Sequence, residues 1–229
     1  MAMRRILAVV TNQATYGTNP HRTGLWIGEL VHFHAGVRRA GFEVDIVSPE
    51  GGPVPLDPRS TRWADRAVRD HMNDSAFMSG LDHTAKAADI DPARYSAIFY
   101  TGGHGVMWDF PSNIALQQAA RQIYENGGMV SSVCHGASGL LNITLSDGSL
   151  LVDGRTVTGF STAEERVAMV KKRVPFLLED ELRKRGAHYV GNTIPMTPFA
   201  TADGRLVTGQ NPYSTKAVTA KIIETLHHL

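Results

Sequence analysis

The sequence predicts an α/β fold in which helices cover both faces of a mostly parallel sheet. Apolar, strand-like runs alternate with helical patterns along the 229 residues. The first unit runs strand, helix, strand, which places its two strands parallel through a right-handed crossover. Glycine-rich segments directly follow predicted strands, at the edge where open α/β sheets form their sites. We therefore expect a flavodoxin-like three-layer sandwich with a small helical excursion.

The first strand–helix–strand unit opens the chain. Residues 4–11 form a continuous apolar run, typical of a strand buried on both faces, and a polar loop follows at 12–23. Apolar side chains three or four residues apart predict a helix over 25–40, with Gly41 just beyond its end. Alternation of polar and apolar residues at 42–47 predicts the second strand.

An excursion over residues 53–93 separates this unit from a third strand predicted at 95–100. Helical pieces at 63–72 and 84–88 have weak periodicity. We expect the excursion to leave the sheet and pack over its end, where it walls the functional site or contributes to a dimer contact.

The second half of the chain continues the alternation. Thr162 with Glu165 three residues later forms a capping box, which predicts a helix to about residue 172. Residues 150–158, with Asp153-Gly154 at the centre, predict a small hairpin. The remaining predicted strands are 129–133, 189–191 and 205–208, and the remaining predicted helices are 112–124, a segment beginning at Ala137, 178–184 and 213–227.

The composition is that of an ordinary globular chain, with 42% hydrophobic residues and a net charge of +1. The basic residues are scattered, so no nucleic-acid partner is expected. Residues 1–11 resemble the start of a signal peptide, but the apolar run ends too early, and no stretch has the length of a membrane helix. The single cysteine, Cys134, excludes an internal disulfide and suits a reducing compartment. We expect one cytoplasmic domain over residues 1–229.

Cys134 follows the strand predicted at 129–133 and precedes the helix expected from Ala137. A strand-to-helix turn would present its side chain at a helix N-terminus, where backbone N–H groups stabilise an anion. A thiol there loses its proton more easily, and the thiolate is a nucleophile. A lone cysteine can also be a small buried apolar residue. The adjacent His135 and Gly136 favour the reactive thiol.

Gly102 and Gly103 follow the strand predicted at 95–100. Their backbone N–H groups, with an N–H from the turn at Cys134-His135, would form an oxyanion hole. A plain turn or a phosphate loop are the alternatives, but the sequence lacks the dinucleotide and P-loop patterns. His104 either lines the same pocket or is a structural histidine.

Glu29 lies three residues after Trp26 and four before Phe33, on the apolar face of the first predicted helix. A carboxylate there is costly unless it is paired or protonated. Glu29 therefore either reaches water at the edge of that face, or is a buried carboxyl that hydrogen-bonds the Cys134 sulfur or handles a substrate proton.

His135 needs a carboxylate to fix its tautomer, and its ring must fold back to reach the neighbouring thiol. Glu164 and Glu165 are the candidates, although acidic residues also simply favour a helix start. The ten histidines show no metal-ligand spacing, so we expect no metal and no other cofactor.

Several of these motifs together resemble the ThiJ/PfpI superfamily, also described as class I glutamine amidotransferase-like, and within it the glyoxalase III and stress-chaperone branch. The resemblance runs from the first strand to the C-terminal helix. The motifs that carry it are Gly102-Gly103-His104-Gly105 with Trp108-Asp109, Val133-Cys134-His135-Gly136, Gly28-Glu29, Ser48-Pro49-Glu50-Gly51-Gly52, and Gly159-Phe160 followed by Glu164-Glu165.

The resemblance implies a flavodoxin-like homodimer with a reactive cysteine in a strained turn. Cys134 would be the nucleophile, His135 the base, Glu165 (or Glu164) the acid that orients His135, and Glu29 the carboxyl hydrogen-bonded to the thiolate. The pocket would be completed by an oxyanion hole at Gly103 and the His135 N–H, and by Gly102, His104 and Trp26.

The implied reaction is the glutathione-independent conversion of methylglyoxal to lactate through a cysteine hemithioacetal, a lyase reaction on a small reactive aldehyde. Two alternatives stay open. One is a cysteine-dependent amidase, peptidase or deglycase on the same framework. The other is a holding chaperone or a redox sensor whose Cys134 oxidises to sulfinic acid. The full set of Cys134, His135, Glu165 and Glu29 favours the glyoxalase, because a sensor needs only an acidic thiol beside a carboxyl.

Overall fold

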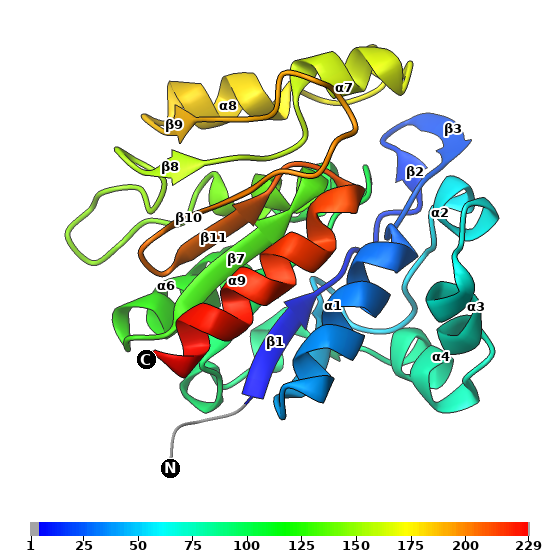
Figure 1. Ribbon diagram of the computed structural model, residues 1–229, viewed down its shortest axis with the longest axis horizontal. Coiled ribbons are helices and arrows are strands. Elements are labelled where there is room, and N and C mark those ends of the chain that lie inside the picture. The colour runs from blue at the N-terminus through cyan, green and yellow to red at the C-terminus, as the bar shows by residue number, and fades with distance from the viewer. Residues whose placement is uncertain (1–4, 229) are drawn as a thin grey trace.

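A computed structural model describes residues 5–228, with a seven-stranded sheet at its centre (Figure 1). The strand order is β10-β11-β7-β6-β1-β4-β5, and every neighbouring pair is parallel except β10 with β11. The predicted sandwich with a mostly parallel sheet is confirmed. Arg4 of the first predicted strand lies outside the described residues, as does the rest of the signal-like start before it. The strands are β1 (Arg5–Val9), β4 (Glu43–Ser48), β5 (Ala85–Lys86), β6 (Ala97–Tyr100), β7 (Met129–Val133), β10 (Ala200–Asp203) and β11 (Leu206–Gly209).

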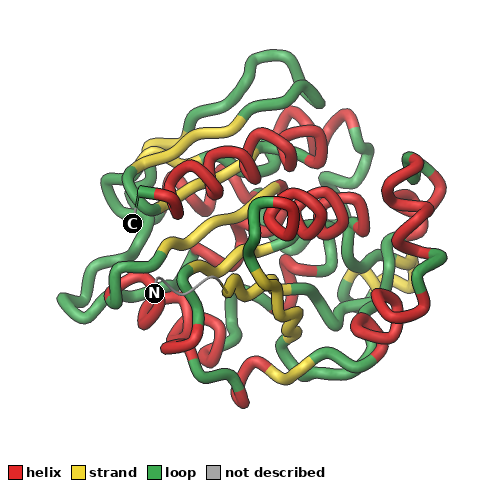
Figure 2. The backbone as a smooth tube through the Cα atoms, turned by 60° about the horizontal axis from the view of Figure 1, so that its bottom comes forward, coloured by secondary structure: helices red, strands yellow, loops and turns green. Residues whose placement is uncertain are grey.

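The middle of the sheet is buried because helices cover both faces. All of β6 and β7 is buried, as is β1 after its first residue. Helices α1 (Ile27–Arg39) and α9 (Thr215–His227) lie together on one face, and α6 (Ile114–Glu125) packs on β6 and β7 from the other (Figures 1 and 2). Helices α1 and α9 approach each other closely at Gly36, where an added Cβ would lie 2.6 Å from Thr219 Cγ2.

The register of the central strands brings three chain segments to one edge of the sheet. Tyr100 at the end of β6 lies opposite Val9 of β1 and Ser132 of β7. The residues that follow these strands therefore meet, as expected for parallel strands. This edge holds the Gly102-Gly103 turn and Cys134.

The first half of the chain differs from the prediction in two places. The predicted polar loop at 12–23 contains a small hairpin of β2 (Thr15–Tyr16) and β3 (Asn19–Arg22). The excursion does not only leave the sheet, because β5 pairs with β4 and forms its edge; the helix predicted at 84–88 is wrong. Its other elements are α2 (Pro58–Arg62), α3 (Arg66–Met72), α4 (Ser75–Asp82), η1 (Ala87–Asp89) and η2 (Pro92–Arg94).

In the second half, α8 (Leu178–Lys184) has the predicted bounds. The hairpin predicted at 150–158 is wrong, since β8 (Thr156–Val157) pairs in parallel with the distant β9 (His188–Tyr189). The predicted capping box is displaced by one residue: Ser161 caps α7 (Thr162–Val167) and Glu164 closes the box. The additional short helices are α5 (Val106–Asp109), η3 (Cys134–Leu140) and η4 (Pro212–Ser214).

Within residues 5–228, no helix is both long enough and apolar enough to cross a membrane.

Candidate active site

Cys134 lies in a strained turn at the end of β7. Its φ of 58° is in the left-handed region, which costs a non-glycine residue about 1–3 kcal/mol. The η3 helix begins at Cys134 itself and not at Ala137 as predicted. Gly136 makes this turn possible, because an added Cβ would lie 2.3 Å from the Tyr100 carbonyl oxygen. The turn thus packs against the end of β6 and holds the thiol at the floor of a pocket.

The His135 ring folds back on the thiol. Its Nδ1 lies 3.3 Å from Cys134 Sγ, and its Nε2 lies 2.8 Å from Glu165 Oε1. Because the carboxylate can only accept, we assign the ring proton to Nε2, which leaves Nδ1 to accept from the thiol. Phe160 packs against the ring with centroids 4.3 Å apart, which holds this orientation.

The choice between the two glutamates is settled by their contacts. Glu165 faces His135, whereas Glu164 accepts hydrogen bonds from Ser161, from the Met196 N–H and from Asn211 Nδ2. Glu164 is therefore a structural residue that joins α7 to the segments before α9. Both side chains are buried.

Glu165 bridges two histidines, since its Oε2 lies 3.4 Å from His104 Nε2. Burial alone would raise the pKa of Glu165, but the charge and hydrogen bonds of His135 and His104 lower it to about 2. Burial, together with the nearby His135, lowers the pKa of His104 to about 4. At neutral pH an ionised Glu165 thus lies beside a neutral His104.

Arg59 is a site residue that sequence reasoning missed. Its Nη2 lies 2.9 Å from His104 Nδ1 and 2.7 Å from Tyr16 Oη, and it forms an ion pair with the buried Asp57. A guanidinium can only donate, so His104 must accept at Nδ1 and carry its proton on Nε2, toward Glu165. Arg59 lies on α2, in the excursion, and the sequence around it contains no pattern that indicates its contact with His104.

Glu29 is fully buried in the first turn of α1, next to Cys134. Its Oε2 accepts from the Gly102 N–H at 2.5 Å, and its Oε1 has no hydrogen-bond partner among the described residues. Burial raises the pKa of Glu29 to about 8, against the lowering effects of Gly102 and Cys134. Of the two sequence alternatives, the structure supports the buried and protonated carboxyl and excludes the water-exposed one.

The oxyanion hole differs from the prediction at Gly102, whose N–H is donated to Glu29 and does not face the cavity. Gly103 does line the cavity, and its N–H has no acceptor among the described residues. Gly103 has a φ of 104°, and an added Cβ would lie 2.1 Å from the Gly24 carbonyl oxygen. The positions left for an oxyanion are therefore the N–H groups of Gly103 and His135.

The Cys134 thiol is not acidified in the free protein, which corrects the expectation from the helix N-terminus. Burial and the neighbouring Glu29 raise the pKa of Cys134 well above its usual value, although the His135 N–H opposes them. A thiol with a raised pKa would need a base to act as a nucleophile, and the nearest base to Cys134 Sγ is His135 Nδ1 at 3.3 Å.

These groups open into a cavity of about 510 Å³. Cys134, His135, His104 and Gly103 lie on its lining, together with Trp26 and Arg59. The size is within the range of cavities that hold small-molecule ligands. The predicted residues Trp26, Gly103, His104, Cys134 and His135 thus share one cavity, with Glu29 and Glu165 behind it.

His104, His135 and Glu165 could also hold a metal ion, because one ligand atom of each lies within 4.8 Å of the others. To bind it, His135 Nε2 would have to give up its hydrogen bond to Glu165. The three residues come from separate segments, which is why histidine spacing did not indicate this group.

Comparison with known proteins identifies the family of this chain. The profile of the DJ-1/PfpI family matches residues 28–225. The chain belongs to the DJ-1/PfpI family. The resemblance inferred from the sequence motifs is thereby confirmed.

Similar members of the DJ-1/PfpI family include two named glyoxalases. Glyoxalase 3 of Candida albicans is 31% identical over 228 residues, covering 95% of this chain and 96% of that protein. The glutathione-independent glyoxalase HSP31 of Saccharomyces cerevisiae is 31% identical over 242 residues and covers 99% of each.

Solved structures show the same fold. Glyoxalase III from C. albicans superposes with a TM-score of 0.89 at 29% identity, covering 98% of each chain. Rapid Encystment Protein 24 KDa of Francisella tularensis superposes with a TM-score of 0.94 at 32% identity, covering 98% of this chain and 99% of that one.

Proposed function

We propose that this protein is a glutathione-independent glyoxalase that converts methylglyoxal to lactate. The similarity to named glyoxalases over almost the full chain supports this function. The observation that carries it is the arrangement around Cys134: a base on one side, His135 Nδ1, and a second proton-handling group on the other, Glu29.

In the first step Cys134 Sγ forms a bond to the aldehyde carbon while the thiol proton passes to His135 Nδ1. Glu165 stabilises the imidazolium that forms, since its Oε1 accepts a hydrogen bond from the Nε2–H, with 2.8 Å between the two atoms. The carbonyl oxygen gains the negative charge and is held by the N–H groups of Gly103 and His135. It then takes the proton back from His135 Nδ1, which gives the hemithioacetal and leaves His135 neutral.

In the second step a base removes the proton from C1, and the resulting enediol is protonated at C2. The aldehyde carbon is oxidised to a thioester while the ketone is reduced to an alcohol, so the redox change is internal. We assign the removal of the C1 proton to Glu29. Its Oε1 has no hydrogen-bond partner among the described residues, and the carboxyl lies beside Cys134. With a pKa of about 8, roughly a tenth of Glu29 is ionised at neutral pH. Water then hydrolyses the thioester, which releases lactate and restores the thiol.

His104 and Arg59 serve as positioning residues in this proposal. Arg59 fixes the His104 tautomer, and His104 in turn donates to Glu165. Glu165 thereby receives an N–H donor on each carboxylate oxygen, which restricts the orientation of its side chain. The homodimer that the family resemblance implies stays a prediction, which sedimentation equilibrium checks.

The reaction in deuterated water tests this assignment. Purified protein is mixed with methylglyoxal without glutathione, and the lactate is analysed by NMR. We expect lactate with deuterium at C2 in part of the molecules, because the proton that Glu29 takes from C1 exchanges in part with solvent during the lifetime of the enediol. Absence of lactate would contradict the proposed function.

A further inference from the structure

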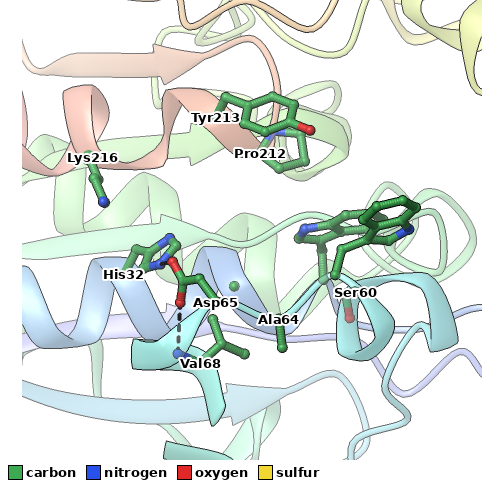
Figure 3. Close-up of a pocket in the computed structure, with 11 residues that line it drawn as sticks. His32, Ser60, Ala64, Asp65, Val68, Pro212, Tyr213 and Lys216 are labelled. Atoms are coloured by element: carbon green, nitrogen blue, oxygen red, sulfur yellow. Dashed lines mark hydrogen bonds and ion pairs between the residues drawn. The ribbon is translucent and has the colours of Figure 1, made fainter. Parts of the chain in front are cut away.

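A second hollow adjoins the catalytic cavity. It has a volume of about 310 Å³, and its lining shares Trp26, Trp63, Pro212 and Tyr213 with that of the catalytic cavity. Figure 3 shows Pro212 and Tyr213 on one side of this hollow and Ser60 and Ala64 on the other. The two hollows therefore adjoin at these four residues, and three of them have aromatic side chains.

The catalytic cavity has more room than methylglyoxal fills. A water molecule occupies about 30 Å³ of liquid, so a three-carbon aldehyde displaces only a few waters from a cavity of about 510 Å³. The remaining space borders apolar walls, and water against such walls is unfavourable. A larger substituent on the same aldehyde would fill it.

The aromatic residues at the junction are unusually open to solvent. Trp63, at the end of α2, is 76% exposed, and Tyr213 in η4 is 64% exposed. Both line the two hollows, so they lie at the junction between them and border the catalytic cavity. A flat ring placed there would cover exposed aromatic surface on two sides.

The charged groups of the second hollow lie away from the junction at Trp63 and Tyr213. His32 Nε2 pairs with Asp65 Oδ2 at 2.8 Å, and Asp65 also caps α3 by accepting from the Val68 N–H. Figure 3 shows these residues and Lys216 at the opposite end from Ser60. Arg59 lies over the Trp26 ring on the side of the catalytic cavity. Trp63 and Tyr213 present their aromatic surface at the junction, which favours an aromatic group there.

We propose that the site takes 2-oxoaldehydes with an aromatic substituent, with the aldehyde at Cys134 and the ring between Trp63 and Tyr213. This inference rests on the proposed function, since it names the substrate class of the same reaction. The chemistry is unchanged: the thiol adds to the aldehyde, the proton moves from C1 to C2, and water releases the product. Phenylglyoxal would thus give mandelate, as methylglyoxal gives lactate.

The first experiment compares initial rates of phenylglyoxal and methylglyoxal turnover without glutathione. We expect kcat/KM to be higher for phenylglyoxal in the wild type. Trp63→Ala and Tyr213→Ala should each lower the phenylglyoxal to methylglyoxal ratio of kcat/KM about three- to tenfold, the usual contribution of an aromatic contact. Ile114→Ala is the matched control, because Ile114 is 60% exposed but lies on α6; its ratio should not change.

The second experiment separates this inference from the proposed function. Mandelate and lactate differ by a phenyl group in place of a methyl, and their binding to Cys134→Ser is measured by calorimetry without any turnover. We expect mandelate to bind at least threefold more tightly, with the difference lost in the Cys134→Ser, Trp63→Ala double variant.

If neither aldehyde reacts but mandelate binds more tightly, the aromatic site stands and the proposed function fails. If methylglyoxal reacts while both variants keep the wild-type ratio and mandelate binds no better than lactate, the inference is overturned and the function stands. Loss of a dimer in Trp63→Ala with an unchanged ratio would assign these aromatic residues to a subunit contact, which also overturns it.

Discussion

Replacing Glu29 with glutamine should make the protein more stable and less active. Glu29 is fully buried, and burial raises its pKa from 4.5 to about 8. The folded protein therefore keeps this proton at pH values where the unfolded chain has lost it. The free energy of unfolding consequently falls as the pH rises from 4.5 through 8. In that interval the unfolded chain is stabilised by losing the proton, whereas the folded protein still holds it.

The size of this effect follows from the pKa. Each pKa unit corresponds to about 1.4 kcal/mol, so the change from 4.5 to about 8 amounts to about 5 kcal/mol over the full range. About 3 kcal/mol of it falls between pH 6 and pH 9. Glutamine keeps an oxygen to accept from the Gly102 N–H but does not titrate. The stability advantage of Glu29→Gln should thus grow by about 3 kcal/mol across that interval.

Urea unfolding of Glu29→Gln and wild type at several pH values measures this difference in stability. In thermal scans, the Tm of the variant relative to wild type should rise by roughly 6–12 °C between pH 6 and pH 9. The same variant should lose about 10²- to 10⁴-fold in turnover, since it removes the group assigned to proton transfer. Glu224→Gln, an exposed change on α9, is the control and should show neither effect. A stability difference between Glu29→Gln and wild type that stays constant from pH 6 to pH 9 would refute the buried, protonated carboxyl. Unchanged turnover would refute its role.

Other substitutions test the rest of the site. Glu165→Gln should lower turnover about a hundredfold or more, because His135 loses the carboxylate that stabilises its charge; it should also remove about 3 kcal/mol of stability that wild type has above pH 4.5 and loses as the pH falls toward 2. Glu164→Gln should instead cost about 2–3 kcal/mol of stability with little change in turnover per folded molecule, measured by urea unfolding and active-site titration. Gly102→Ala should lower turnover about a hundredfold, since its Cβ would lie 2.7 Å from Glu29 Oε2; wild-type rates in a folded variant would contradict this.

The sequence allowed the fold and most of the candidate site to be predicted, because these features depend on local patterns. The strand 129–133, the glycine turn at 102–103 and the apolar face that carries Glu29 each have a signal within a few residues. The parallel sheet then brings their ends together. The predicted cysteine, histidine and both relevant carboxyls accordingly meet at one edge.

The parts that could not be predicted depend on contacts between distant segments. Arg59 lies 45 residues from His104 in the chain, within an excursion whose periodicity is weak. The Gly102 N–H turns toward Glu29 because of the side-chain packing of α1, which no local pattern encodes. The hairpin predicted at 150–158 failed because Thr156 pairs with His188, a distant strand partner that replaces the turn expected at Asp153-Gly154.

The pKa of Cys134 shows how burial can overrule a local rule. A helix N-terminus lowers the pKa of a thiol, but complete burial and an adjacent carboxyl raise it more. In the proposed mechanism the thiol therefore depends on His135 for deprotonation during attack, and its reactivity depends on the Glu165–His135 hydrogen bond.

Lactate formation by wild type and Cys134→Ser, side by side, tests the central claim most directly. Both proteins are incubated with methylglyoxal in the absence of glutathione, and lactate is quantified over time, with circular dichroism to confirm that the variant is folded. We predict catalytic turnover by wild type and none by Cys134→Ser, because a serine hydroxyl in place of the thiol does not form the thioester intermediate. Equal rates in the two proteins, or no lactate from wild type, would contradict the account.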